Sequence, residues 1–176
     1  MSQQFAWAED PPPPSRIDKQ VFRPAKNSTN FVRFLGAIVG VYMHWHALEK
    51  KSLPCTGPDC SLCPEPRRWK GYAPALLWRH IEKNWAPIVA DITENSIEIT
   101  RENEPLRGKI FEVRRPGQRN NSPIIMTFRE DKGTDNLPEP FDVKPILVRL
   151  WGYQLRSSEL RTSDNHENIL PFTKSG

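Results

Sequence analysis

All three cysteines of the chain lie in one short segment, at positions 55, 60 and 63. An odd, clustered set of cysteines in a reducing compartment indicates metal ligation rather than disulfide bonds. Cys60 and Cys63 have the spacing of a chelating turn, and Gly57 and Pro58 let the loop turn back between Cys55 and Cys60. The loop is poor in apolar residues, so we expect a bound ion to order it.

A tetrahedral zinc site needs a fourth ligand, and two histidines precede the cysteines. His44 and His46 end an expected strand, where side chains two positions apart point to the same face. We favour His44, because the extra residues leave the loop more slack to close. His46 is an alternative, as is His80 beyond the loop. The sequence therefore predicts a closed, structural Zn²⁺ site made by His44 and the three cysteines; three unrelated thiols are the competing interpretation.

The spacing of these residues does not match catalytic sites. Zinc nucleobase deaminases carry an H-x-E motif and a later P-C-x-x-C motif. Here Glu49 lies three positions after His46, and four residues separate Cys55 from Cys60. A thiolate bound to zinc is not free to act as a nucleophile, and the sequence contains no phosphate-cradling glycine loop or hydrolase elbow. We therefore expect a protein that is not an enzyme.

Proline and polar residues separate two expected tails from one domain. The 176 residues include 18 prolines, and 37% of them are hydrophobic, so part of the chain is expected to lie outside a core. Residues 1–20 contain four consecutive prolines and are expected to form a flexible tail. The polar residues 156–176 are expected to form a second flexible tail. A single domain is then predicted over 21–155, with the zinc loop at 44–68.

Short runs rich in β-branched and aromatic residues predict strands in this domain. The run 31–45 contains Gly36 and Gly40, which indicate a bend or bulge. The run 69–80 begins as a strand, and its second half is either strand or short helix. The run 87–100 is either a hairpin or a helix end followed by a strand.

Two further runs complete the expected set. Apolar and polar residues alternate on both sides of a turn in 107–130, which makes this segment the clearest hairpin. The run 143–153 predicts one more strand, interrupted by Pro145. The sequence therefore predicts a mainly β protein, and a small OB-like barrel with the zinc loop as an insertion is favoured over a sandwich.

Basic and aromatic residues alternate along these expected strands, and the chain has a formal net charge of +4. Cations neutralise phosphates and aromatic rings stack on unpaired bases, so single-stranded nucleic acid needs both. Trp78 is a further candidate for stacking, and a solvated hairpin tip is an equally good interpretation of the last three arginines. The residues expected to bind nucleic acid are Arg67, Arg68, Trp69, Lys70, Tyr72, Arg114, Arg115 and Arg119.

One histidine, one cysteine and a C-x2-C pair, in this order within a basic β-rich domain, resemble the zinc-containing single-stranded-DNA-binding proteins of T4-type phages. The resemblance implies an OB-fold loop held by His44 (or His46) and the three cysteines, and a basic, aromatic-lined cleft for DNA. The run 107–115 also looks like a barrel hairpin of that kind. The gap between the first two cysteines is shorter than in that family, and its acidic C-terminal tail is missing. The missing acidic tail puts recruitment of partners through the tail in doubt.

We therefore expect a cytoplasmic protein that binds single-stranded DNA or RNA, with DNA favoured. The N-terminus does not have the features of a signal peptide, and the apolar runs are too short to cross a membrane. Two other functions fit the same features. One is a nucleic-acid-binding subunit of a larger mobile-element or defence nucleoprotein complex. The other is a zinc-knuckle adaptor that binds proteins.

Overall fold

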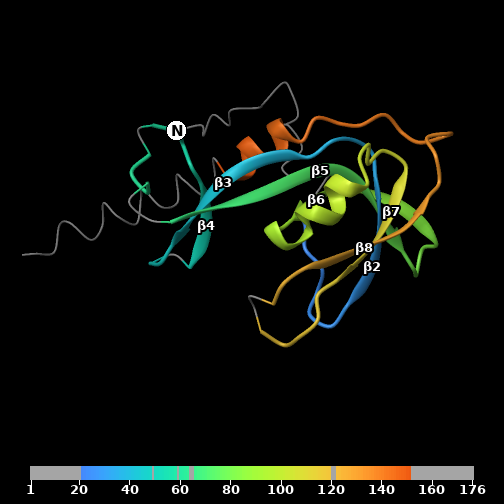
Figure 1. Cartoon of the computed structure of the whole chain (residues 1–176), viewed down its shortest axis with the longest axis horizontal. Helices are drawn as coiled ribbons and strands as arrows, with labels where there is room; N and C mark the ends of the chain where they lie inside the picture. The colour runs from blue at the N-terminus through green and yellow to red at the C-terminus, as the bar shows by residue number, and fades with distance from the viewer. Residues whose placement is uncertain (1–20, 49, 59, 64–65, 120–121, 152–176) are drawn as a thin grey trace, which may run out of the picture.

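The computed structural model describes residues 21–48, 50–58, 60–63, 66–119 and 122–151. Both predicted tails, 1–20 and 156–176, therefore lie outside the described residues, as does the end of the predicted domain at 152–155. The fold is mainly β, as predicted, and its strands form one mixed, eight-stranded sheet (Figure 1). The strands are β1 (Val21–Phe22), β2 (Thr29–Phe34), β3 (Val39–His46), β4 (Lys51–Pro54), β5 (Arg67–Arg79), β6 (Asn84–Ile92), β7 (Lys109–Arg114) and β8 (Ile125–Asp131).

The long strand β5 connects the two ends of the sheet. Strand β6 pairs with it along one edge. Along the other edge, β3 pairs with the first half of β5 and β2 with the second half. Strand β4 extends the sheet from β3, whereas β7 and β8 extend it from β2, and β1 lies parallel to β6. The described strands do not close into a barrel, so the sheet is open where the sequence analysis favoured an OB-like barrel.

A proline on β5 lies where its neighbouring strand is interrupted. The backbone N–H of Leu35 donates to the carbonyl oxygen of Pro74 at 2.9 Å, just after β2 ends. Because proline has no N–H to donate, it fits a strand where the partner ladder stops. A Cβ on Gly36 would lie 3.2 Å from Cγ of Pro74 and 3.1 Å from Cβ of Pro140. The bend predicted at Gly36 is therefore confirmed, and it separates β2 from β3.

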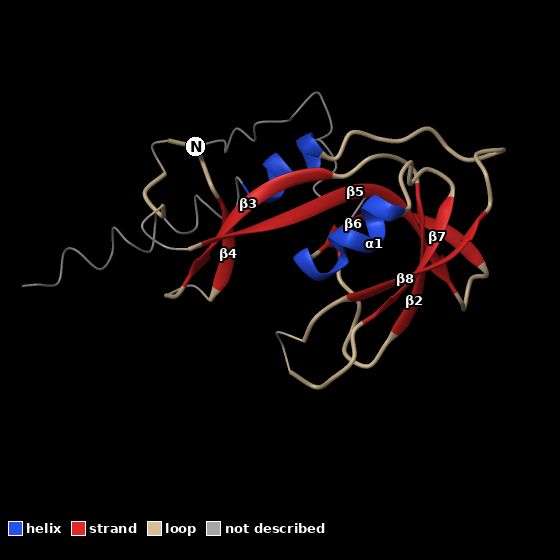
Figure 2. Cartoon of the chain, viewed as in Figure 1, coloured by secondary structure: helices blue, strands red, loops and turns tan. Residues whose placement is uncertain are grey.

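Each face of β5 contributes to a different core, because successive side chains on a strand point to opposite faces. Ala73 and Ala75 belong to the largest hydrophobic cluster, against which Ile99 packs from helix α1 (Ile97–Glu102). Tyr72 belongs to a second cluster that includes Leu147, from a helical segment at 144–151. The two helical segments therefore cover opposite faces of β5 (Figure 2). Among the described residues, no helix is long and apolar enough to cross a membrane.

The strand predicted at 143–153 is wrong, because residues 144–151 are helical. Pro145 lies in the first turn, where an N–H has no partner within the helix and its absence costs little. A side-chain oxygen of Asp142 accepts a hydrogen bond from the backbone N–H of Lys144 at 2.9 Å, as a helix-capping group does. Val143 and Leu147, four positions apart, are both buried in the second cluster.

The structure also decides the segments that the sequence left open. The whole of 69–79 is strand, as part of β5. The segment 87–100 matches neither alternative: β6 ends at Ile92, and the 3-10 turn η1 (Glu94–Ser96) leads into α1. The hairpin predicted at 107–130 is confirmed, because β7 and β8 pair in antiparallel fashion from Lys109 and Asp131 to Arg114 and Ile125.

The indole ring of Trp69 lies across two glycines on neighbouring strands. Gly40 on β3 and Gly71 on β5 are directly opposite each other. A Cβ on Gly40 would lie 2.5 Å from Nε1 of Trp69, and a Cβ on Gly71 would lie 2.5 Å from Cη2 of the same ring. The two glycines therefore provide the space that the indole ring occupies.

We predict that Gly40→Ala lowers the free energy of unfolding by about 1–3 kcal/mol, since the new methyl group forces the indole ring to move. Chemical denaturation measures this change. In a Trp69→Leu background, which removes the obstructing ring, the same alanine should cost less than about 0.5 kcal/mol. An equal cost of the alanine in both backgrounds would contradict the assigned contact.

Candidate metal centre

The four predicted ligands come together at one end of the sheet. The ligand atoms of His44, Cys55, Cys60 and Cys63 all lie within 4.8 Å of one another. The Sγ atoms of Cys55 and Cys63 are 3.8 Å apart, and Nε2 of His44 is 3.9 Å from Sγ of Cys63. Tetrahedral coordination with Zn–S of about 2.3 Å and Zn–N of about 2.0 Å would place these pairs about 3.8 and 3.5 Å apart. The residues present therefore fit a zinc ion in both chemistry and size.

The β3–β4 hairpin positions the first two ligands. His44 on β3 lies opposite Leu53 on β4. The backbone N–H of Cys55 donates to the carbonyl oxygen of Tyr42 at 2.8 Å, which extends this ladder past the end of β4. Because residues two apart on a strand share a face, the side chains of His44 and Cys55 emerge on the same face of the hairpin.

Two turns return the other cysteines to this face. The backbone N–H of Cys60 donates to the carbonyl oxygen of Gly57, and that of Cys63 donates to the carbonyl oxygen of Cys60, each at 3.1 Å. Gly57 has φ of 102°, a conformation that favours glycine. The short cysteine spacing therefore produces a compact ligand loop.

The surroundings of the three thiols bias their protonation in different directions. A hydrogen bond from the backbone of Thr56 lowers the pKa of Cys60 to about 6. A backbone hydrogen bond at Gly57, followed by one to His44, lowers the pKa of Cys55. The pKa of Cys63 is raised to about 11, mainly through its hydrogen bond with Cys55. Zinc binds thiolates, so a bound cation would take the place of the proton on Cys63.

The structure selects His44 from the three candidate histidines. The ligand group contains His44, which is 1% exposed, and does not contain His46. His46 lies opposite Lys51, at the turn end of the hairpin and farther from Cys55. His80 lies beyond the other end of β5, with its ring 6.5 Å from that of Trp78. The strand register, rather than the slack of the loop, determines which histidine faces the cysteines.

Five of the eight predicted nucleic-acid-binding residues lie on β5, with unequal exposure. Arg67 and Arg68 are exposed and lie opposite His44 and Met43, beside the metal centre. Lys70 pairs with the buried Asp91 at 2.9 Å. Trp69 is half-buried, and its indole ring lies against Gly40 and Gly71.

The prediction that Tyr72 stacks on bases needs correction. Tyr72 is 4% exposed, and its ring packs in the second hydrophobic cluster. The centre of this ring lies 5.9 Å from the centre of a ring of Trp151. Helical segment 144–151 covers this face, so the ring face is not available to a base.

The other three predicted residues lie at the end of β7 and in the loop that follows it. Arg114 ends β7, which pairs with β2 and β8, whereas the metal centre lies beside β3 and β4 (Figure 1). Arg114 pairs with Glu112 at 3.1 Å, and Arg119 is exposed. Arg115 is 8% exposed and donates to the carbonyl oxygen of Pro24 at 3.4 Å, a structural contact rather than a free cation. The eight residues therefore do not form one surface.

Sequence reasoning missed two aromatic residues beside the metal centre. Tyr42 and Trp45 on β3 are 48% and 57% exposed. The guanidinium of Arg67 lies 4.6 Å from the centre of the Tyr42 ring, within range of a cation–π contact. The run 31–45 is mostly apolar and aromatic, so its sequence carries no signal that separates the exposed rings from the core residues.

We predict that His44→Ala removes the bound zinc and lowers the melting temperature by about 10 °C or more, since a structural zinc site contributes several kcal/mol. Elemental analysis of the purified protein and a thermal melt measure the two effects. His46→Ala is the matched control, because it removes an imidazole two positions away on the same face. Equal zinc content in the two variants would contradict the ligand assignment.

A comparison with protein-family models finds no match for this chain. Comparisons with curated proteins and with solved structures find no match either. The resemblance to the T4-type phage proteins therefore stays a prediction. The assignment that the geometry supports is a His/Cys group capable of binding a metal ion.

Proposed function

We propose that this chain is a non-enzymatic protein that binds single-stranded nucleic acid through the metal-bearing end of its sheet. This end is called the metal arm and comprises β3, β4, the three cysteines and residues 67–70. The observation that carries the proposal is the exposure of two aromatic rings and two guanidinium groups around the metal centre, at Tyr42, Trp45, Arg67 and Arg68.

Each face of the metal arm carries an exposed aromatic ring and an exposed arginine. The strand register puts Tyr42 and Arg67 on the same face as His44, where the guanidinium lies over the ring. Trp45 and Arg68 emerge on the opposite face. Arginines neutralise phosphates and release counterions, and aromatic rings stack on bases of any sequence. The arm therefore supplies both interactions that a single strand requires.

Zinc would serve this arm as a structural element. The ion would hold the ligand loop against the β3–β4 hairpin, and exposed residues of β3 and β5 would make the contacts with nucleic acid. His44 is buried, so it is a ligand that orients the arm and not a contact residue. In this proposal the metal takes part in no reaction.

A protein-binding adaptor is a second candidate, because the turn of the hairpin also exposes apolar surface. Leu48 is 85% exposed in the turn that follows β3. An apolar partner surface would bind through burial of Leu48 and Trp45, with little dependence on salt. Nucleic-acid binding through arginines weakens steeply as salt rises, so the salt dependence separates the two candidates.

We predict that Arg67→Ala/Arg68→Ala weakens binding to a 20-nucleotide single-stranded probe and makes the salt dependence shallower. The logarithm of the binding constant falls linearly with the logarithm of the salt concentration. Loss of two phosphate contacts should make the magnitude of this slope smaller by about 1.4. Fluorescence anisotropy at several salt concentrations measures both quantities.

The matched control is Arg114→Ala/Arg119→Ala, which removes the same charge far from the metal arm. This control should bind nearly as tightly as the unchanged protein. Equal losses in the two double variants would show that net charge, and not the arm, governs binding.

We also predict that Trp45→Leu lowers affinity for the same probe by about tenfold, because base–aromatic stacking contributes roughly 1–3 kcal/mol per base. The affinity is measured by the same anisotropy titration. Ile81→Ala removes a 93% exposed apolar side chain in the turn between β5 and β6 and should leave affinity unchanged. Unchanged affinity of the Trp45 variant would remove this ring from the interface.

A further inference from the structure

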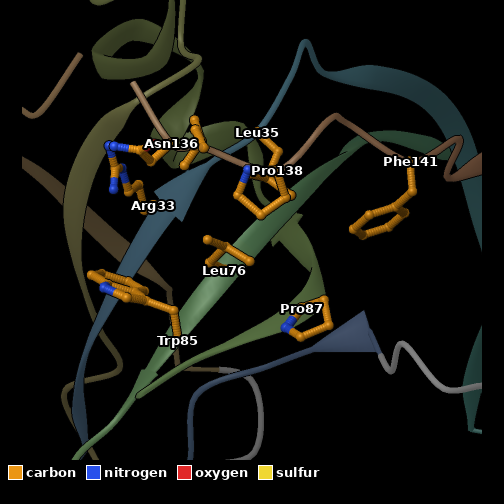
Figure 3. A pocket seen from close by; sticks show the side chains of 9 residues that line it. Arg33, Leu35, Leu76, Trp85, Pro87, Asn136, Pro138 and Phe141 are labelled. Atoms are coloured by element: carbon orange, nitrogen blue, oxygen red, sulfur yellow. The ribbon is translucent and has the colours of Figure 1, made fainter. Parts of the chain in front are cut away.

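A pocket of about 460 Å³ lies apart from the metal arm, and none of its lining residues belongs to the arm. It opens between the beginning of β6 and the segment 136–141 (Figure 3). Its floor includes Leu35 and Leu76, which are 1% and 7% exposed. Small-molecule sites have volumes of about 300–1,000 Å³, an apolar lining and a few polar groups, and this pocket has the first two features.

Two aromatic rings border the apolar floor. Trp85 lies on one side of the pocket, and Phe141 lies at the end away from Arg33 (Figure 3). The Trp85 ring is half-buried and held by an edge-on contact with Trp78, whose ring centre is 5.3 Å away. A fixed indole beside an apolar floor is suited to a flat ring, which would bury one face against the tryptophan.

Two polar side chains lie together at the other end of the pocket, at Arg33 and Asn136 (Figure 3). Nε of Arg33 donates to the carbonyl oxygen of Gly108 at 3.3 Å, and Nη2 donates to that of Gly133 at 3.1 Å. These bonds fix the guanidinium, while its Nη1 has no hydrogen-bond partner among the residues that the structure describes.

Asn136 adds an exposed amide beside this guanidinium. Its backbone has φ of 55°, and its side chain makes no hydrogen bond to any described residue. The apolar pocket therefore ends in hydrogen-bonding groups that are available to a ligand.

We propose that this pocket holds one purine base of the bound strand, an inference that rests on the proposed function. The ring would lie against Trp85, with its N7 edge toward Arg33 and Asn136. Arginine binds O6 and N7 of guanine, and asparagine binds N6 and N7 of adenine. A pyrimidine lacks N7 and the second ring, so it would fill less of the floor and reach fewer donors.

The pocket and the metal arm lie at different positions along β5, on either side of the part that helical segment 144–151 covers at Tyr72. Arg68 and Leu76 are eight positions apart and therefore point to the same face, at a distance of roughly 26 Å along the strand. Single-strand sites on β domains cover about 4–16 nucleotides. A bound strand that passes around segment 144–151 would contact Arg68 and Trp45 and place one base in the pocket.

The test uses the full-length, zinc-loaded protein with three probes: GMP, CMP and ribose 5-phosphate. Calorimetry should show that GMP binds at least about fivefold more tightly than CMP. Ribose 5-phosphate has the phosphate but no base, and it should not bind. Equal affinity for GMP and CMP, or binding of ribose 5-phosphate as tight as that of GMP, would overturn the proposal.

Two variants locate the GMP site. Trp85→Leu keeps an apolar side chain but removes the indole face, and it should weaken GMP binding about tenfold. Asn136→Gly tolerates the positive φ and should reduce the preference for GMP over CMP. Unchanged GMP binding in both variants would overturn the proposal.

Trp45→Leu separates the pocket from the metal arm, because it should weaken oligonucleotide binding and leave GMP binding intact. If the arm binds oligonucleotides but GMP does not bind, the pocket proposal fails and the proposed function stands. If GMP binds in the pocket but no oligonucleotide binds, the proposed function fails, and with it the assignment of the base to a bound strand.

Discussion

The metal arm depends on the four ligands that meet at its base. Strand β4 has four residues and pairs with β3 at the edge of the described sheet, and its Leu53 is 2% exposed. An isolated two-stranded hairpin is only marginally stable in water. In the proposal, a metal ion held by His44 and the cysteines would tie the hairpin to the ligand loop. In the proposed function, this crosslink would hold the strands that carry the exposed rings and arginines in register.

Local spacing made the metal ligands predictable, whereas long-range packing determined the residues that sequence reasoning misplaced. The cysteines and His44 are close in sequence, and one hairpin brings them together. The strand pattern around Tyr72 does not distinguish a buried side chain from an exposed one. Tyr72 is buried because a helical segment more than 70 positions later covers it. That segment contains β-branched residues and a proline, so it resembles an interrupted strand until Pro145 is placed in the first turn of a helix. The exposure of Trp45 likewise depends on packing and not on residue type, since Met43 on the same face of β3 is 5% exposed whereas Trp45 is 57% exposed.

Strand β5 joins the three regions that the proposed function uses. Its first residues carry the exposed arginines beside the metal centre, its middle crosses both cores, and Leu76 lies in the floor of the pocket. A cross-strand pair of glycines accommodates Trp69 where the arm meets the main sheet. The arm is therefore a continuation of the rigid sheet and not a separate appendage, which fixes its orientation toward the pocket.

The most direct measurement of the central claim is X-ray absorption at the zinc edge of the purified, zinc-loaded protein. The account predicts one zinc ion per chain with three sulfur neighbours at about 2.3 Å and one imidazole nitrogen at about 2.0 Å. A coordination shell of oxygen and nitrogen without sulfur, or a protein that retains no zinc, would contradict it.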